Sequence, residues 1–178
     1  MKILKYILLI ILAIVVIVLI AALFIKKEYN VERQIIINKP SHTVFDYIKY
    51  LKNQDYYSKW VMTDPNMKKI FTGTDGTVGF IYAWDSQQKS AGKGEQEIKN
   101  IADDKRIDME VRFIKPFAGV AQVYMITDSL SDGQTKVTWG MNGRSSYPMN
   151  IMNLFMDNML GKDLNTSLIT LKNILESK

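Results

Sequence analysis

The sequence contains no cysteine and one histidine, His42. The absence of cysteine excludes disulfides, thiol nucleophiles and cysteine-ligated metals. A single histidine excludes a metal site built on several histidines, and a histidine-based catalytic triad would have to use His42. Because His42 falls in the first turn of an expected helix, we interpret it as a solvated residue near the helix start. We therefore expect neither a metal nor a cofactor, and we assign no catalytic residue.

The chain also lacks an excess of positive charge outside its N-terminal segment. The formal net charge of the 178 residues is +5. Four of the 23 basic residues flank an apolar segment, namely Lys2, Lys5, Lys26 and Lys27, which leaves 19 basic residues against 18 acidic ones. Binding to nucleic acid needs a basic face on the domain itself. The charge balance therefore predicts that nucleic acid is not a partner.

A long hydrophobic run extends from Ile7 to Ile25 without a charged residue. At about 1.5 Å per residue, a helix over residues 7–25 is about 30 Å long, enough to cross the hydrocarbon core of a bilayer. A cleaved secretory signal is the alternative, but its apolar core is usually about 7–15 residues and ends in a motif of small residues. We therefore predict a retained single-pass membrane anchor over residues 1–28, with basic flanks, and one domain over residues 29–178. Lysines on both flanks leave the side of the membrane open.

The segment that follows the apolar run alternates polar and apolar residues from Tyr29 to Asn38, which predicts a strand. A helix with Ser41 as its N-cap should come next, with Val44, Phe45, Ile48 and Leu51 on its apolar face. Asp55 to Trp60 should form a second short helix or a turn. Six further strands are expected at Lys68–Thr72, Val78–Asp85, Gly92–Ile101, Arg106–Lys115, Gly119–Leu130 and Thr135–Gly143.

A long helix is predicted from Met149 to Leu175, with Gly161 as a kink or a join between two helical segments. Its apolar residues recur every three or four positions and so share one face. These residues are Met152, Met156, Leu160, Leu164, Leu168, Leu171 and Leu175. Since antiparallel strands with one apolar face need a cover, we predict an α+β fold in which a curved seven-stranded antiparallel sheet wraps around this helix.

The order strand, helix pair, six strands and long helix resembles the START-related helix-grip superfamily, in particular its polyketide cyclase/dehydrase-like (SRPBCC) branch with an N-terminal membrane helix. The motifs that carry the resemblance are Asn38-Lys39-Pro40, Val44–Tyr47, Ser58-Lys59-Trp60, Asp64–Met67, Gly79–Trp84, Gly92-Lys93-Gly94, Thr135–Gly140 and Phe155-Met156-Asp157. One departure is Asn53–Tyr57, which stands where a Trp-Pro pair is often found. The resemblance implies the helix-grip fold. It does not select an activity, because the superfamily includes lipid carriers, cyclases, hydrolases and regulators.

Large aromatic and methionine side chains are expected to line a cavity between the sheet and the C-terminal helix. The predicted ligand-binding residues are Tyr82, Trp84, Phe113, Trp139, Met141, Met156 and Leu160. Three polar side chains, Arg33, Gln96 and Asn100, are expected to project toward the same side. Gly92-Lys93-Gly94 lacks the strand–loop–helix setting of a phosphate loop, so we interpret it as a strand bend or bulge.

These patterns favour a membrane-anchored domain that binds a lipid-like or other hydrophobic small molecule. Two alternatives remain: a cyclase/dehydrase-type enzyme acting on a hydrophobic substrate, and an interaction or regulatory domain without a ligand. The enzyme is placed second because the sequence has one histidine and no cysteine, and nothing places two carboxylates across one cleft as a general acid–base pair.

Overall fold

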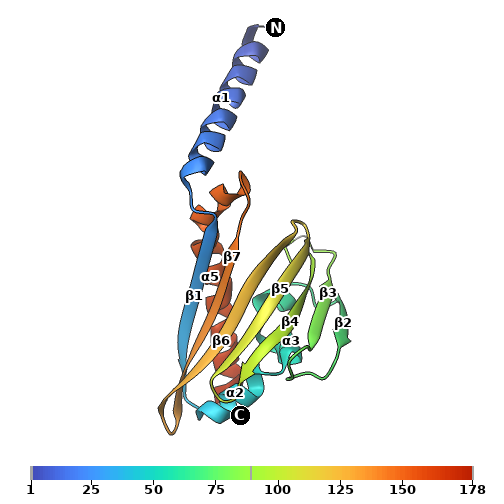
Figure 1. Ribbon diagram of the computed structural model, residues 1–178, viewed down its shortest axis with the longest axis vertical. Coiled ribbons are helices and arrows are strands. Elements are labelled where there is room, and N and C mark those ends of the chain that lie inside the picture. The colour runs from blue at the N-terminus through green and yellow to red at the C-terminus, as the bar shows by residue number, and fades with distance from the viewer. Residues whose placement is uncertain (1, 89, 178) are drawn as a thin grey trace.

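The computed structural model describes residues 2–88 and 90–177 and shows a long N-terminal helix projecting from an α+β domain (Figure 1). The helices are α1 (Lys2–Phe24), α2 (Ser41–Ile48), η1 (Leu51–Asn53), α3 (Gln54–Tyr57), α4 (Lys59–Met62), η2 (Met149–Met152) and α5 (Asn153–Glu176). The strands are β1 (Glu28–Ile37), β2 (Lys68–Thr72), β3 (Ile81–Asp85), β4 (Lys93–Ala102), β5 (Arg106–Lys115), β6 (Gly119–Ser131) and β7 (Gln134–Arg144).

The seven strands form one antiparallel sheet in the order β1-β7-β6-β5-β4-β3-β2. Consecutive strands from β2 to β7 are neighbours, as expected for strands joined by short turns. The connection through α2, α3 and α4 carries the chain from β1 to the opposite edge of the sheet. The long helix α5 packs against the core face of this sheet. The predicted α+β architecture, a curved seven-stranded antiparallel sheet around a C-terminal helix, is confirmed.

The core face is built from rows of residues that pair across neighbouring strands. One row runs across β1, β7, β6, β5 and β4, and it consists of Val31, Met141, Val123, Met109 and Ile98. Each of these side chains is at most 6% exposed. From the helical side, α5 contributes Leu164, Leu168, Leu171 and Leu175, and α2 contributes Val44, Phe45 and Ile48. At about 1.5–3 kcal/mol for each fully buried side chain, this contact is the main source of stability.

The predicted helical stripe is fully buried only in its second half, from Leu164 onward. Met152 is exposed, because it lies in the 3-10 turn η2, whose three-residue period places it out of phase with the α-helical stripe. Met156 and Leu160 are half-buried and pack at the edge of the core. Burial therefore increases along α5, and the contact between helix and sheet is most exposed to solvent at the N-terminal end of the helix.

Gly161 does not join two helical segments, since α5 continues through this residue. A Cβ atom at this position would lie 2.0 Å from Nη2 of Arg33, which projects from β1 toward the helix. Glycine is therefore present because the guanidinium crosses the helix surface at this point.

Two irregularities interrupt the pairing of β4 with β5. The pairing of β4 with β5 shifts between Lys93 and Gly94 and again between Ile98 and Asn100. The first shift is the bulge predicted at Gly92-Lys93-Gly94. The second turns Asn100 to the outer face, where its amide donates to Asp108, so its predicted inward orientation is wrong. Gln96, before the second shift, points inward as predicted.

Two element starts also differ from the prediction. β3 begins at Ile81 rather than at Val78, because Gly79 has a left-handed backbone with φ of 87°. The N-cap position of α2 is Pro40, which makes no side-chain capping bond, and the Ser41 hydroxyl instead donates to the carbonyl of Asp104. The apolar face predicted for this helix is confirmed, with Val44, Phe45 and Ile48 buried.

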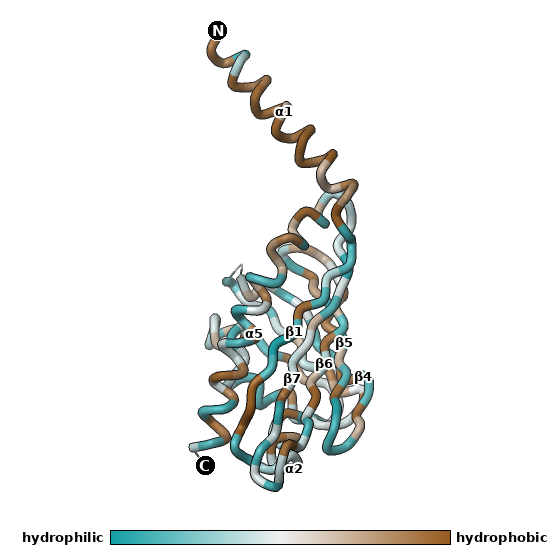
Figure 2. Tube along the Cα trace, turned by 90° about the vertical axis from the view of Figure 1, so that its left-hand side faces the viewer, coloured by the Kyte–Doolittle hydropathy of each residue, from teal (hydrophilic) through white to brown (hydrophobic). Residues whose placement is uncertain are grey.

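Among the described residues, one helix is long and apolar enough to cross a membrane: residues Ile3–Phe24 of α1, with a mean hydropathy of 3.7 (Figure 2). Its carboxyl end contacts the domain through two asparagines. The Asn150 amide donates to the carbonyls of Ala22 (2.6 Å) and Ile25 (2.8 Å). The Asn153 amide donates to those of Lys26 and Lys27. The Ala22 carbonyl is one that the end of a helix leaves without an intrahelical partner, and the other three belong to the residues that follow α1. Together the bonds connect the end of α1 to η2 and to the start of α5.

A chain that starts at Lys27 is expected to be soluble and to unfold in one cooperative thermal transition. The hydrophobic core cluster consists of residues from Val31 onward, so deletion of residues 1–26 removes none of its members. Circular dichroism during heating would measure this. A truncated protein that is insoluble, or that loses its signal without a cooperative step, would contradict the division into an anchor over residues 1–28 and a domain over residues 29–178.

Candidate functional site

The structure brings the seven predicted ligand-binding residues into one cluster on the core face of the sheet and the facing side of α5. They are Tyr82, Trp84, Phe113, Trp139, Met141, Met156 and Leu160. Tyr82, Trp139 and Met141 are buried, and we call these three the floor. The other four are half-buried and pack against the core from the end of the domain nearest α1. Their shared location is as predicted from the alternation; that they line a ligand cavity stays a prediction.

Pairing between the strands sets the positions of Trp84 and Phe113, two of the predicted aromatic residues. Trp84 pairs with Gly94, which in turn pairs with Phe113. The two aromatic rings meet edge to face at 6.4 Å between centroids. A Cβ atom at residue 94 would lie 2.7 Å from the Trp84 ring, so glycine allows the indole to lie against β4. The Trp84 indole N–H donates to the carbonyl of Ala91 at 2.9 Å, which fixes the ring.

A second aromatic group surrounds Trp139 on the floor. The ring of Trp139 meets those of Tyr57 and Trp60 edge to face, with 5.8 Å and 6.1 Å between the ring centroids. Tyr57 was not predicted as part of the site, because the four-residue helix α3 is too short to produce a periodic signal. The Trp139 indole nitrogen and the Gln54 side-chain nitrogen are buried and have no hydrogen-bond partner among the described residues. Trp139 on the floor and Gln54 in the adjoining α3 therefore carry donor groups without an acceptor among the described residues.

Arg33 projects inward from β1, as predicted, but it binds α5. Its guanidinium forms two parallel bonds to the Asp157 carboxylate, each 2.9 Å long, and a third bond to the Asp157 carbonyl. Hydrogen bonding to Arg33 lowers the pKa of Asp157, and the same bond raises the pKa of Arg33. The Arg33–Asp157 ion pair thus joins the edge strand β1 to the N-terminal half of α5, and it uses the guanidinium of Arg33 for this contact.

A polar group between α3 and the β2–β3 hairpin consists of Tyr82, Asp55 and Lys69. The Tyr82 hydroxyl donates to Asp55 at 2.6 Å, and Lys69 forms an ion pair with the same carboxylate at 2.8 Å. Burial raises the pKa of Tyr82, and the bond to Asp55 raises it further. Tyr82 is therefore a protonated donor at neutral pH. Sequence patterns could not identify this group, because its members come from three separate elements.

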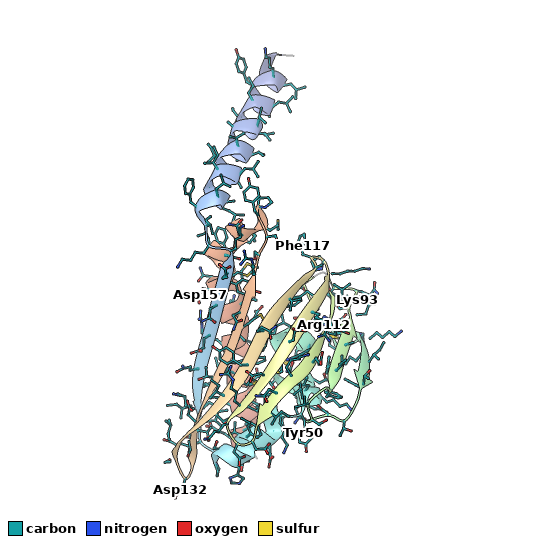
Figure 3. All side chains as sticks on the ribbon, in the orientation of Figure 1. Tyr50, Lys93, Arg112, Phe117, Asp132 and Asp157 are labelled. Carbon is teal, nitrogen blue, oxygen red and sulfur yellow. The ribbon has the colours of Figure 1, made fainter. Side chains whose placement is uncertain are left out.

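An exposed apolar rim lies at the end of the domain from which α1 projects (Figures 1 and 3). One part of it comes from η2 and the start of α5, and the other from the β5–β6 hairpin, where Phe117 is 71% exposed. The rim consists of Met149, Met152, Leu154, Phe155, Met159 and Phe117. Ile114 and Val120 are also exposed, but they alternate with Phe113 and Ala121 and so lie on the outer face of the sheet. Along α5, the half-buried Met156 and Leu160 lie between this rim and the buried Leu164. The apolar surface is thus continuous from the rim into the core.

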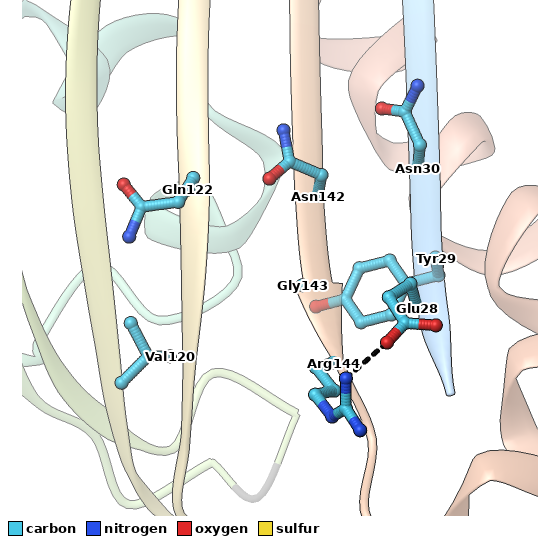
Figure 4. Close-up of a pocket in the computed structure, with 8 residues that line it drawn as sticks. All are labelled: Glu28, Tyr29, Asn30, Val120, Gln122, Asn142, Gly143 and Arg144. Carbon is cyan, nitrogen blue, oxygen red and sulfur yellow. Dashed lines mark hydrogen bonds and ion pairs between the residues drawn. The ribbon is translucent and has the colours of Figure 1, made fainter. Parts of the chain in front are cut away.

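Two surface depressions are found elsewhere on the described part of the chain. One, of about 430 Å³, lies on the outer face of β1, β7 and β6, and it contains Asn30, Gln122, Asn142 and the Glu28–Arg144 ion pair (Figure 4). The other, of about 690 Å³, lies near Ser41 and the β4–β5 turn. Neither of the two is lined by a residue predicted for the site.

No family model matches the chain, and no curated protein has a significantly similar sequence. Solved structures are similar in fold. Norcoclaurine synthase from Thalictrum flavum, in complex with dopamine and hydroxybenzaldehyde, matches with a TM-score of 0.65 and 8% identity over 85% of this chain and 88% of the synthase. A protein from Chromobacterium violaceum matches with a TM-score of 0.60 and 13% identity, over 83% and 96%. Ara h 8.0201 matches with a TM-score of 0.59 and 11% identity, over 85% and 99%.

At such low identities these similarities establish the fold rather than an activity. They agree with the predicted α+β architecture. The chain therefore has the helix-grip fold, which it shares with these solved structures.

Proposed function

We propose that this protein is anchored in a membrane by α1 and binds a lipid-like or other hydrophobic small molecule between the sheet and α5. The observation that carries the proposal is the row of apolar side chains along α5 that extends from the exposed rim, through the half-buried Met156 and Leu160, into the core that contains the floor. Half-buried aromatic and methionine side chains in a concave setting are typical of sites for apolar ligands. An exposed apolar surface of this extent is unusual unless it contacts a partner, a ligand or a membrane.

The placement of α1 supports a lipid-derived ligand. Residues Ile3–Phe24 would span roughly 30 Å as a helix, which matches the hydrocarbon thickness of a bilayer. β1 begins at Glu28, directly after α1, and Asn150 and Asn153 bind the helix end. The rim would therefore lie at the bilayer surface. A molecule leaving the lipid phase would reach the rim before the floor.

The enzyme alternative has less support from the described residues. Norcoclaurine synthase, which shares the fold, is an enzyme whose structure holds two small aromatic molecules. General acid–base catalysis, however, works best with a group whose pKa lies near the working pH. On the floor, Tyr82 has a raised pKa, and Arg33 of the adjacent strand β1 is bound to Asp157. A ligand-free interaction domain is the other alternative, and it would need a protein partner to cover the rim.

Titration of the full chain with fatty acids, isoprenoids and flat aromatic compounds is expected to give a saturable change in tryptophan fluorescence for at least one class. Met156→Trp should weaken that binding by about tenfold or more, because a larger side chain at this half-buried position would occupy the space between sheet and helix. Ile169→Trp is the matched control: it adds the same indole to α5 at an exposed position. If no class gives saturation, the binding proposal fails and the interaction domain takes its place.

A further inference from the structure

The interior beside the floor contains four hydrogen-bond donors that do not bind an oxygen acceptor in the described part of the chain. The indole N–H of Trp139 and the amide N–H groups of Gln54 have no acceptor among the described residues, and the two side chains are 2% and 6% exposed. Two further buried donors reach only sulfur: the Tyr57 hydroxyl lies 3.9 Å from Sδ of Met125, and the Gln96 amide lies 2.8 Å from Sδ of Met109. A thioether is a weak acceptor.

These donors belong to one neighbourhood. Tyr57 contacts the ring of Trp139, and Gln54 precedes Tyr57 by one turn of α3. Met125, the partner of the Tyr57 hydroxyl, pairs with Trp139 across β6 and β7. Met109 is two residues beyond Ile107, which pairs with Met125 across β5 and β6. The four donors therefore lie over adjoining strands of the core face.

Folded proteins satisfy most of their buried polar groups, so a cluster of buried donors without oxygen acceptors requires an explanation. We propose that the ligand is an uncharged molecule with an apolar body and a hydrogen-bond acceptor oxygen, such as the carbonyl of a ketone, quinone or ester, and that Trp139 and Gln54 donate to this oxygen. This inference rests on the proposed binding function and specifies the chemistry of that ligand.

Charge decides between a neutral and an anionic acceptor. The nearest inward cation on the sheet, Arg33, is held by Asp157 in two bonds of 2.9 Å, and Lys69 is paired with Asp55. The donors themselves are neutral side chains. A carboxylate placed among them would lose its hydration without gaining a counter-ion, which is costly in a buried site. A carbonyl oxygen loses much less hydration and gains the same hydrogen bonds.

The test compares matched probes on the full chain in detergent, with the tryptophan indoles labelled with ¹⁵N for NMR. The flat set is 2-acetylnaphthalene, 2-ethylnaphthalene and 2-naphthoate; the linear set is an alkyl methyl ketone, the matching alkane and the matching fatty acid. We expect the ketone of at least one set to bind about tenfold more tightly than its hydrocarbon and its acid. We also expect that ketone to shift the indole proton of Trp139, which Trp139→Phe identifies by loss of its signal.

Three variants separate a specific donor from a general effect on packing. Trp139→Phe and Gln54→Met should each reduce the preference for the ketone over the hydrocarbon several-fold, because they remove a donor and keep an apolar side chain of similar shape. Trp84→Phe is the control, since its indole already donates to Ala91; it should weaken ketone and hydrocarbon alike and leave their ratio unchanged. Detergent partitioning of a probe is common to all variants, so their ratios compare directly.

The possible outcomes distinguish this inference from the function on which it rests. Equal binding of ketone and hydrocarbon, or an unchanged ratio in both Trp139→Phe and Gln54→Met, would overturn the inference and leave hydrophobic binding in place. Tighter binding of the acids would overturn it in favour of an anionic ligand. Failure of every probe in both sets to bind would overturn the inference together with the proposed function.

Discussion

Replacing Leu168 with alanine is expected to lower the free energy of unfolding by about 2–5 kcal/mol. Leu168 is 1% exposed and lies on the stripe of α5 that packs against the sheet, one turn after the fully buried Leu164. The loss has two parts: the transfer free energy of the deleted methyl groups and the cavity that they leave behind. Leu164→Ala should cost a similar amount. Chemical denaturation of the full chain in mild detergent would measure both.

Ile169→Ala is the control, because Ile169 follows Leu168 in the same helix but is 53% exposed. Its change in unfolding free energy should stay within about 0.5 kcal/mol, since a surface substitution loses little burial and alanine favours the helix. If Leu168→Ala cost less than about 1 kcal/mol, the stripe would not be the contact that holds the sheet to the helix.

The fold could be predicted because its signals are local and repeated. Alternation of polar and apolar residues indicates β1, β5 and β7, and helical spacing from Leu164 to Leu175 indicates the buried half of α5. Each signal follows from burial of one face, so the periodicity of the sequence reports it directly. Short turns between neighbouring strands then leave few alternatives to an antiparallel sheet.

The errors lie where one residue contacts a segment that is distant in the sequence. Gly161 looks like a helix breaker, but its role depends on Arg33 of β1, which is 128 positions earlier. Asn100 follows a bulge in β4, and a bulge of one residue reverses every later side chain in a pattern that otherwise alternates. Neither contact leaves a periodic signal in the sequence.

The candidate site was predictable as a set of side chains but not in its polar detail. The face of each strand places Tyr82, Trp139 and Met141 on the floor. Whether a buried donor finds an acceptor depends on packing between elements, as for Trp139 beneath Tyr57 of α3. The same is true of Asp55, whose partners Tyr82 and Lys69 lie on other elements. Those polar contacts, rather than the apolar lining, carry the information about ligand chemistry.

Gly92→Ala is expected to lower the free energy of unfolding by about 2–5 kcal/mol, for two independent reasons. Gly92 has φ of 62°, a left-handed conformation that side chains other than glycine adopt at a cost of roughly 1–2 kcal/mol. In addition, a Cβ atom there would lie 2.1 Å from the carbonyl oxygen of Lys115. That contact is with backbone, so it cannot be relieved by rotation of a flexible side chain and requires β4 and β5 to separate.

The same substitution should also reach the candidate site. The Gly92 carbonyl accepts a bond from the Ser86 amide, and the adjacent Ala91 carbonyl accepts the indole N–H of Trp84. Separation of the strands would release the Trp84 ring, so affinity for a bound apolar ligand should fall along with stability. Gly119→Ala is the matched control: no atom lies within 4 Å of the added Cβ, and its φ is not positive, so its unfolding free energy should change by less than about 0.5 kcal/mol. Equal stability of the two variants would show that the approach of Lys115 to Gly92 does not constrain this end of the sheet.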